Sequence, residues 1–142
     1  MNDIAAIKDL LDRHRLAWDS GDGDAYAASW TADGTYTTWL GSTYRGREDI
    51  ARSHQALFDS FLKGTVMTLQ VQDIRSYGPD TAVVTTLGDV GKKVVSKPSK
   101  VQTYTVVRVD GEWLIAAFQN TKRAALREAI SFKLQPATKP RG

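Results

Sequence analysis

The spacing of apolar residues changes once along this chain, close to Gly64. Before that point apolar residues recur every three or four positions, as on one face of a helix. After it they alternate with polar residues, as in strands that are buried on one side. Helices that cluster early and strands that follow one another late predict an α+β fold rather than an alternating α/β fold. The expected order is α-α-β-α-β-β-β-β, with a curved antiparallel sheet wrapped around three helices and a pocket at its wide end.

Three helices are expected in the first half of the chain. Residues 3–19 place their apolar side chains on one face, and Gly21 ends this helix. Asp24 is expected to cap a short second helix that runs to Trp30. Residues 47–62 form the third, because acidic side chains in its first turn suit the helix dipole. The apolar faces of the first and third helices each carry one histidine, and their members are Ile4, Ile7, Leu11, His14 and Trp18, then Ile50, His54, Leu57, Phe58 and Phe61.

Five strands are expected, from β-branched and aromatic runs that are separated by turn residues. Asp110-Gly111 is a hairpin turn signal, whereas Gly41 to Gly46 are expected to form a loop. The expected strands cover residues 35–39, 65–75, 81–90, 100–109 and 112–121.

Length and charge favour one globular domain followed by a basic tail. The chain has 142 residues, a usual size for one domain. Its net charge of +3 comes from residues 122–142, which hold six basic residues and one acidic residue. Because the only aromatic residue among these charges is Phe132, no nucleic-acid partner is expected. We expect a domain over residues 1–123 and a tail over residues 124–142.

Several classes of protein do not fit the sequence. The chain has no cysteine, which excludes disulfides and thiolate chemistry. Its first residues resemble no signal peptide, and no apolar run is long enough to span a bilayer. A cytoplasmic location without a membrane partner is therefore expected. No phosphate-binding glycine loop, nucleophile elbow or dinucleotide fingerprint is present, so no cofactor is expected.

The two histidines are the candidate chemical groups. His14 lies on the apolar face of the first helix, where burial would lower its pKa and keep it neutral. It is the candidate general acid or base, and the alternative is a core histidine that a backbone carbonyl or a carboxylate satisfies. For His54 the alternatives are likewise a role in the pocket or a structural hydrogen bond. No carboxylate stands at a convincing ligand spacing from either histidine, so no metal is expected.

Aromatic side chains are expected to wall a pocket inside the sheet. One face of the last strand carries Trp113, Ile115, Ala117, Gln119 and Thr121. With this face inward, Ala117 would leave room for a ligand and Gln119 would supply a hydrogen bond. Such a pocket suits a flat or elongated apolar molecule. The candidate ligand-binding residues are His14, Trp18, Trp30, Tyr36, Thr38, His54, Phe58, Ala117 and Gln119.

Four short pieces of the sequence stand in a characteristic order: Trp18 with Gly21-Asp22, Asp33-Gly34, Gly46 followed by Ile50 and His54, and Trp113 with Ala117-Phe118-Gln119-Asn120-Thr121. In this order, from about residue 3 to residue 123, the chain resembles the nuclear-transport-factor-2-like superfamily. That superfamily includes the SnoaL-like cyclases and the ketosteroid isomerases, and the likeness is closest to the small SgcJ/EcaC-type proteins. The resemblance implies a cone of strongly curved antiparallel sheet with three helices inside, often dimerising through the outer sheet face. Members of the SgcJ/EcaC type are associated with bacterial polyketide pathways, including enediyne ones, where polyene binding is implied.

The resemblance also bears on catalysis. His14 takes the position at which ketosteroid isomerases have their oxyanion-stabilising tyrosine. Thr38 stands where they carry a proton-shuttling carboxylate, and Thr103 or Thr105 stands where they carry a second acid. Because both carboxylates are missing, the steroid-isomerase mechanism is not expected.

Three functions remain open from the sequence. The first is a homodimeric protein that binds a hydrophobic, polyketide- or polyene-derived small molecule in a bacterial secondary-metabolite pathway. The second is a cofactor-independent cyclase, isomerase, dehydratase or hydrolase, with His14 as acid or base and with Tyr36 and Gln119 orienting the substrate. The third is an oligomerisation module without a ligand, which would use the apolar side chains of residues 100–109.

Overall fold

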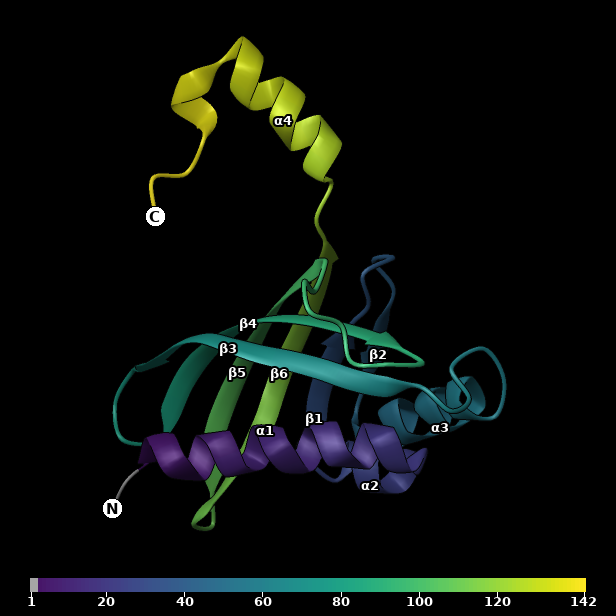
Figure 1. The fold of residues 1–142 in the computed structure, drawn as a ribbon. Coiled ribbons are helices and arrows are strands. Elements are labelled where there is room, and N and C mark those ends of the chain that lie inside the picture. The colour runs from purple at the N-terminus through teal and green to yellow at the C-terminus, as the bar shows by residue number, and fades with distance from the viewer. Residues whose placement is uncertain (1–2) are drawn as a thin grey trace.

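A single six-stranded sheet curves around the N-terminal helices in the computed structural model, which describes residues 3–142 (Figure 1). The expected α+β fold is confirmed. The helices are α1 (Asp3–Ser20), α2 (Gly23–Ala27), α3 (Arg47–Phe58), α4 (Ala125–Leu134) and the short 3-10 helix η1 (Pro136–Thr138). The strands are β1 (Trp30–Thr37), β2 (Thr43–Arg45), β3 (Val66–Ser76), β4 (Thr81–Gly91), β5 (Lys100–Val109) and β6 (Glu112–Lys122).

The strands lie in the order β2-β1-β6-β5-β4-β3. Every neighbouring pair is antiparallel except β1 and β6, which are parallel, so the expectation of a wholly antiparallel sheet is wrong at this one pairing. The strands from β3 to β6 follow one another in sequence and in space, as the alternating pattern predicts. Within the sheet, β1 is the strand that pairs the N-terminal half with this meander, through β6.

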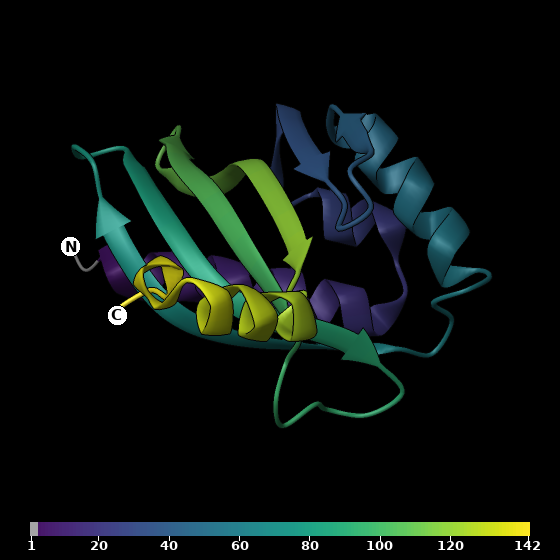
Figure 2. The ribbon, with the colours of Figure 1, turned by 90° about the horizontal axis from the view of Figure 1, so that it is seen from above.

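The core fills the space between the sheet and the helices α1 to α3. Helix α1 crosses the sheet, while α2 and α3 pack together near β1 and β2 (Figures 1 and 2). The buried face of α1 consists of Ile7, Leu10, Leu11, His14 and Trp18. Its spacing is the helical period that the sequence shows, so the prediction of an amphipathic first helix is confirmed.

Several expected boundaries shift. Asp22, not Asp24, caps α2, because its side chain accepts a hydrogen bond from the backbone N–H of Ala25. This helix ends at Ala27, and Trp30 already belongs to β1. Helix α3 ends at Phe58, so residues 59–62 are turns rather than helix.

The expected loop from Gly41 to Gly46 contains the short strand β2. Thr43, Tyr44 and Arg45 pair with the end of β1 as an antiparallel hairpin. The three residues give too short a run for an alternating pattern to be recognised. This hairpin carries several side chains of the pocket described below.

A bulge in β6 changes which of its residues face the core. Thr105 pairs with Ala117 and Val106 pairs with Ile115, so Ala116 is the extra residue on β6. Before the bulge, Trp113 and Ile115 are buried, while after it Phe118 is buried instead of Ala117. The expected alternation along the whole strand is therefore wrong in its second half, because one inserted residue moves every later side chain to the other face.

The C-terminal segment stands away from the body (Figure 1). Among the described residues, η1 is the only element against which α4 packs appreciably, and α4 has no buried residue. Within residues 3–142, every helix is too short or too polar to cross a lipid bilayer.

Candidate functional site

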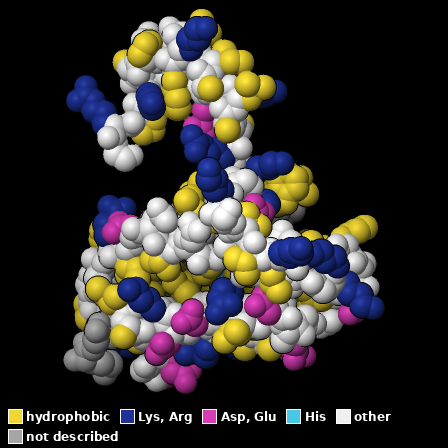
Figure 3. All heavy atoms as spheres, viewed as in Figure 1, with side chains coloured by type: hydrophobic (Ala, Val, Ile, Leu, Met, Phe, Trp, Pro, Cys, Tyr) yellow, Lys and Arg dark blue, Asp and Glu magenta, His cyan; other side chains and the backbone are white. Residues whose placement is uncertain are grey.

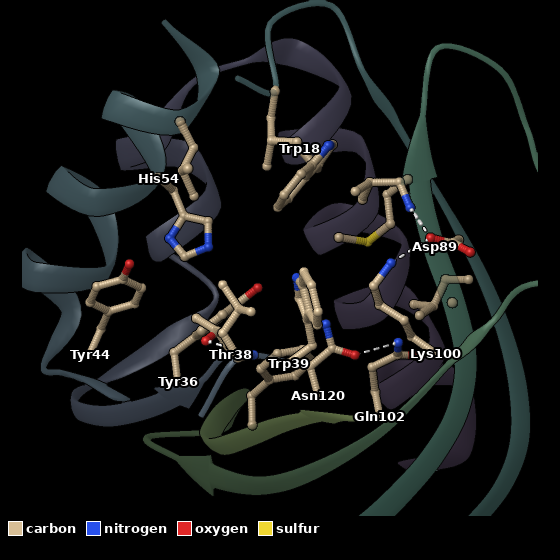
Figure 4. Close-up of a pocket in the computed structure, with 18 of the residues that line it drawn as sticks. Trp18, Tyr36, Thr38, Trp39, Tyr44, His54, Asp89, Lys100, Gln102 and Asn120 are labelled. Carbon is tan, nitrogen blue, oxygen red and sulfur yellow. Dashed lines mark hydrogen bonds and ion pairs between the residues drawn. The ribbon is translucent and has the colours of Figure 1, made fainter. Parts of the chain in front are cut away.

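A cavity of about 370 Å³ opens between α3, the β1–β2 hairpin and the adjoining ends of β3 to β6 (Figure 4). Its position at one end of the curved sheet agrees with the expectation of a pocket at the wide end. Four of the candidate residues line it, namely Trp18, Tyr36, Thr38 and His54. Volumes of roughly 300–1,000 Å³ are usual for small-molecule sites, so this cavity lies near the lower limit.

Closely packed aromatic rings make the inner wall rigid. Tyr36 lies 4.4 Å from Phe118 and 4.5 Å from His54, measured between ring centroids. The indole N–H of Trp18 donates to the hydroxyl of Thr65 at 3.0 Å, which fixes that ring at the side of the cavity. Because these groups are satisfied or stacked inside the protein, they offer a ligand mainly apolar surface. Burial raises the pKa of Tyr36 to about 12, so its hydroxyl stays protonated.

His54 is held in one tautomer. Its Nδ1 lies 2.8 Å from the backbone carbonyl oxygen of Ile50, one turn earlier in α3. A carbonyl oxygen can only accept, so the hydrogen is on Nδ1, and in the neutral ring Nε2 carries a lone pair. Burial lowers the pKa of His54 to about 4, although the bond to Ile50 acts in the opposite direction. The neutral ring is directed into the cavity, where Nε2 is a hydrogen-bond acceptor (Figure 4).

A chain of side-chain amides crosses the floor of the cavity. Thr86 donates to Oε1 of Gln102 at 2.7 Å, and Nε2 of Gln102 donates to Oδ1 of Asn120 at 3.0 Å. This chain fixes the orientation of both amides and leaves the NH2 group of Asn120 as a donor. Gly88 makes room for the arrangement, because a Cβ there would lie 2.7 Å from Oε1 of Gln102.

An ion pair borders the cavity on the other side. Lys100 donates to Asp89 at 2.8 Å, and both side chains are largely shielded from solvent. Partial burial would raise the pKa of Asp89, but hydrogen bonds from Lys100 and Ser99 outweigh it and lower the pKa to about 2. The ammonium of Lys100 also lies 5.9 Å from the centre of the Trp39 ring, at the rim.

His14 is not in the cavity. It is fully buried behind the aromatic wall, and its Nε2 lies 3.0 Å from the hydroxyl of Tyr104. Burial, together with the charge of His54, lowers the pKa of His14 to about 3. The expected position of His14 as the pocket's acid or base is therefore wrong, because Tyr104 and the rings of Tyr26 and Trp30 enclose it.

Four further candidates also lie away from the cavity lining. Trp30 and Phe58 are buried in the core, where they support the wall from behind. Ala117 and Gln119 fall on the outer face because of the bulge at Ala116, and Gln119 is exposed. The bulge places Phe118 and Asn120 in the cavity instead.

Sequence reasoning missed most of the polar lining: Tyr44, Asp89, Lys100, Gln102 and Asn120. The sequence did contain a signal for Gln102, which stands in an otherwise alternating apolar strand. A buried amide without a partner is costly, so an amide at this position indicates a polar partner inside the protein. Asn120 was hidden by the bulge and Tyr44 by the short strand β2. Among the described residues no group of three or more His, Asp or Glu side chains could hold a metal ion.

Comparison with known proteins places this geometry among familiar folds. A family model of the SnoaL-like domain matches residues 1–119. A domain of unknown function with a cystatin-like fold from Nostoc punctiforme is 25% identical, with a TM-score of 0.79, over 96% of this chain and 87% of the other. No curated protein matches the chain.

Two more solved structures share the fold at lower identity. The protein Aln2 from a Streptomyces species is 16% identical, with a TM-score of 0.74, over 89% of this chain and 94% of the other. A ketosteroid isomerase-like protein from Erwinia carotovora atroseptica is 17% identical, with a TM-score of 0.68, over 87% of this chain and 98% of the other. These likenesses show the fold.

Proposed function

We propose, from the premise that the chain belongs to the SnoaL-like domain family, that it binds a largely apolar small molecule in the cavity beside α3. The observation that carries this proposal is the cavity itself: an aromatic wall with a few polar groups at fixed positions. Sites of this kind take most of their affinity from buried apolar area and their selectivity from the few polar contacts.

The polar groups define the ligand more closely. Nε2 of neutral His54 accepts a hydrogen bond, and the amide NH2 of Asn120 donates one. A ligand with a hydroxyl at one point and a carbonyl or ether oxygen at another would satisfy both. We therefore propose a flat or elongated, oxygenated apolar compound, and the resemblance to the SgcJ/EcaC type favours a polyketide- or polyene-derived one from a bacterial secondary-metabolite pathway.

A cofactor-independent enzyme is the second candidate, and His54 is the observation that favours it. A neutral imidazole with a free Nε2 inside an apolar cavity is able to take a proton from a bound substrate. General bases work best when their pKa is near the working pH, however, and the pKa of His54 is about 4. His54 is therefore better suited to accept a hydrogen bond than to remove a proton, which ranks binding above isomerase, cyclase, dehydratase or hydrolase activity.

We also propose a homodimer that forms through the outer face of the sheet. The outward-facing side chains of β4 and β5 include Val83, Leu87, Val101 and Val107, none of which is fully buried in the single chain. Contact between two such faces would remove apolar area from water. The same experiment that identifies a ligand reports the number of subunits.

The test is native mass spectrometry of the protein purified from its own host, followed by titration of the recovered compound into variants. The proposal expects a bound apolar compound that is released unchanged, with subunits in pairs. Asn120→Ala is expected to weaken binding by about tenfold, the value of one buried hydrogen bond. Gln119→Ala is the matched control, because it removes an amide from the outer face of the same strand.

Equal affinity of the Asn120 and Gln119 variants would contradict the assigned cavity. A compound that is converted by the protein, with conversion lost and binding kept in His54→Gln, would instead establish the enzyme.

A further inference from the structure

Exposed apolar side chains surround the mouth of the cavity. Trp39 and Leu40 project from the β1–β2 hairpin and are 47% and 74% exposed, and Phe61 after α3 is 89% exposed. Val94, in the connection between β4 and β5, is 77% exposed and precedes Val95, whose backbone N–H donates to the lining residue Thr68. Single exposed apolar residues are ordinary, but a group that borders a cavity marks an interaction surface.

Basic side chains stand around the same mouth. Residues 92–100 hold four lysines and no acidic residue, and residues 122–142 hold six basic residues and one acidic residue. Figure 3 shows dark blue side chains gathered where the C-terminal segment leaves the body. The exposed lysines in segments next to lining residues are Lys63, after Leu62, then Lys92, Lys93 and Lys97, between Val90 and Lys100, and Lys122, two residues after Asn120.

Several acidic residues lie at the opposite end, where Arg108 pairs with Asp3 and Asp80. Asp80 lies in the turn between β3 and β4, and Asp110 lies in the turn between β5 and β6. Asp9 and Glu112 border a groove beside this second turn. Because residues 92–100 and 122–142 carry a net positive charge, the mouth is the side of the molecule that an anionic surface would attract.

Helix α4 adds an amphipathic element at the mouth. It starts three residues after β6, whose last residue, Lys122, lies over the rim residue Trp39 at 5.5 Å. Leu126, Ile130 and Leu134 recur every four positions and are 77%, 53% and 80% exposed. A helix of ten residues is only marginally stable in water by itself. Contact between this apolar stripe and another surface would therefore stabilise α4.

We propose that the mouth and α4 together bind the surface of an anionic lipid bilayer. The apolar rim and the stripe of α4 would enter the region between headgroups and acyl chains, and the lysines would face the lipid phosphates. This is attachment to one face of a membrane, for which no spanning helix is needed. It rests on the proposed function in one respect: an apolar ligand would pass between cavity and lipid without crossing water.

The positive charge around the mouth favours an anionic bilayer over the other surfaces that could cover the apolar rim and the stripe of α4. A second copy placed mouth to mouth would set lysines against lysines. The stripe of α4 folded back onto its own mouth would bring Arg127 and Lys133 toward the same lysine group. An anionic surface is the one partner that gains from both sets of charges.

Flotation with vesicles tests the proposal on the full chain. Vesicles of phosphatidylcholine with about 30% phosphatidylglycerol are expected to carry the protein, and vesicles of phosphatidylcholine alone are not. Raising the salt from about 0.05 to 0.5 M is expected to weaken attachment, because it screens the lysine contacts. Absence of attachment to the anionic vesicles at low salt would overturn the proposal.

Two pairs of substitutions locate the surface. Lys93→Glu with Lys97→Glu is expected to weaken vesicle binding by more than about tenfold. Lys8→Glu with Arg13→Glu makes the same change of charge at exposed positions of α1 and is expected to leave binding within about twofold. An equal loss in both pairs would show attraction by net charge alone and would overturn the assigned surface.

Two more variants examine insertion of the apolar groups. Lipids brominated on the acyl chain are expected to quench tryptophan emission in the protein, and Trp39→Phe is expected to remove most of that quenching. Leu126→Ser with Leu134→Ser is expected to weaken flotation several-fold. Loss of a dimer in this last variant, without vesicle binding by the unaltered protein, would assign the stripe of α4 to a second copy instead.

Ligand titration without vesicles separates this proposal from the proposed function. The lysine and α4 variants are expected to bind the recovered compound in solution as the unaltered protein does. A protein that attaches to vesicles but binds no compound would support the membrane surface and refute the cavity's role. Ligand binding without attachment would do the reverse.

Discussion

His14 and His54 share a low pKa but reach it in different surroundings. For His14 the cause is complete burial, followed by the charge of His54, and the pKa is about 3. For His54 the cause is burial, which exceeds the opposing effect of its bond to Ile50, and the pKa is about 4. Both rings are therefore neutral in the folded protein at any pH where an unfolded histidine, with a pKa near 6.5, begins to gain a proton.

Because the pKa of each histidine is lower in the folded than in the unfolded chain, mild acid destabilises the folded protein. Between about pH 6 and 4.5 the unfolded chain binds two protons that the folded chain does not, so stability falls as the pH falls. Each histidine contributes about 1.4 kcal/mol per pH unit, which gives a slope of about 2.8 kcal/mol per unit for the pair. Above about pH 7.5, where the unfolded histidines have lost their protons, this contribution is constant. Urea unfolding at half-unit intervals of pH measures the slope.

The variant His54→Gln supplies the comparison. It is expected to lower the stability at pH 7 and to halve the slope, because one titrating group is removed. A slope that is unchanged in this variant would mean that His54 is not neutral and buried in the folded protein. Asp89 does not enter this window, since its pKa of about 2 and its ordinary value both lie below it.

At the level of the elements, α2 and α3 are joined so closely that one methyl group would disturb them. A Cβ on Gly23 would lie 2.5 Å from the backbone oxygen of Ala51 and 2.9 Å from the Cβ of Gln55. The backbone N–H of Gly23 also donates to the side chain of Gln55 at 2.8 Å. Gly23→Ala is therefore expected to destabilise the protein by about 1–3 kcal/mol, the usual cost of overpacking.

Gly91→Ala is the matched control for this contact. At Gly91 the nearest atom to an added Cβ lies 3.8 Å away, and the backbone conformation is one that alanine adopts. Its effect is expected to stay within about 0.5 kcal/mol. Thermal and urea unfolding of the two variants measure these changes in stability. A Gly23→Ala variant as stable as the unaltered protein would show that α2 and α3 can separate.

The elements that could be predicted from sequence are those with a sustained hydrophobic period. The first helix, the third helix and the four strands after Gly64 all have one, and their expected bounds lie within a few residues of the observed ones. Features that depend on one or three residues were not foreseen. The strand β2 is too short to show a period, and the bulge at Ala116 leaves no local mark in the sequence.

The bulge explains why the site was harder to predict than the fold. Alternation along residues 113–121 assigns Gln119 to the inside, and one unpaired residue exchanges it for Asn120. For His14 the predicted helix face is correct, but three aromatic neighbours, supplied by other elements, stand between it and the cavity. Trp18, Tyr36 and His54 line the pocket as expected, because each lies where its element borders the open end of the sheet.

For the molecule as a whole, the domain of residues 1–123 is proposed to be stable without its tail. Helix α4 buries no residue, and Arg123 is the last residue with a backbone hydrogen bond to the body, at Ser99. Removal of residues 124–142 is therefore expected to change the melting temperature by less than about 2 °C. Differential scanning calorimetry of the shortened and full chains measures this, and a fall of more than about 5 °C would show that the tail is part of the folded unit.

The parallel pairing of β1 with β6 has a consequence for the order of assembly during synthesis. The neighbour of Trp30 in the sheet is Ile115, so the helical half leaves the ribosome long before its place in the sheet exists. The bond between His14 and Tyr104 also joins residues 90 positions apart. Long-range contacts of this kind slow folding and leave early segments uncovered in the meantime. The nascent chain would thus expose the apolar face of α1 until its last strand emerges. During this interval a chaperone that covers the apolar face would protect the chain most.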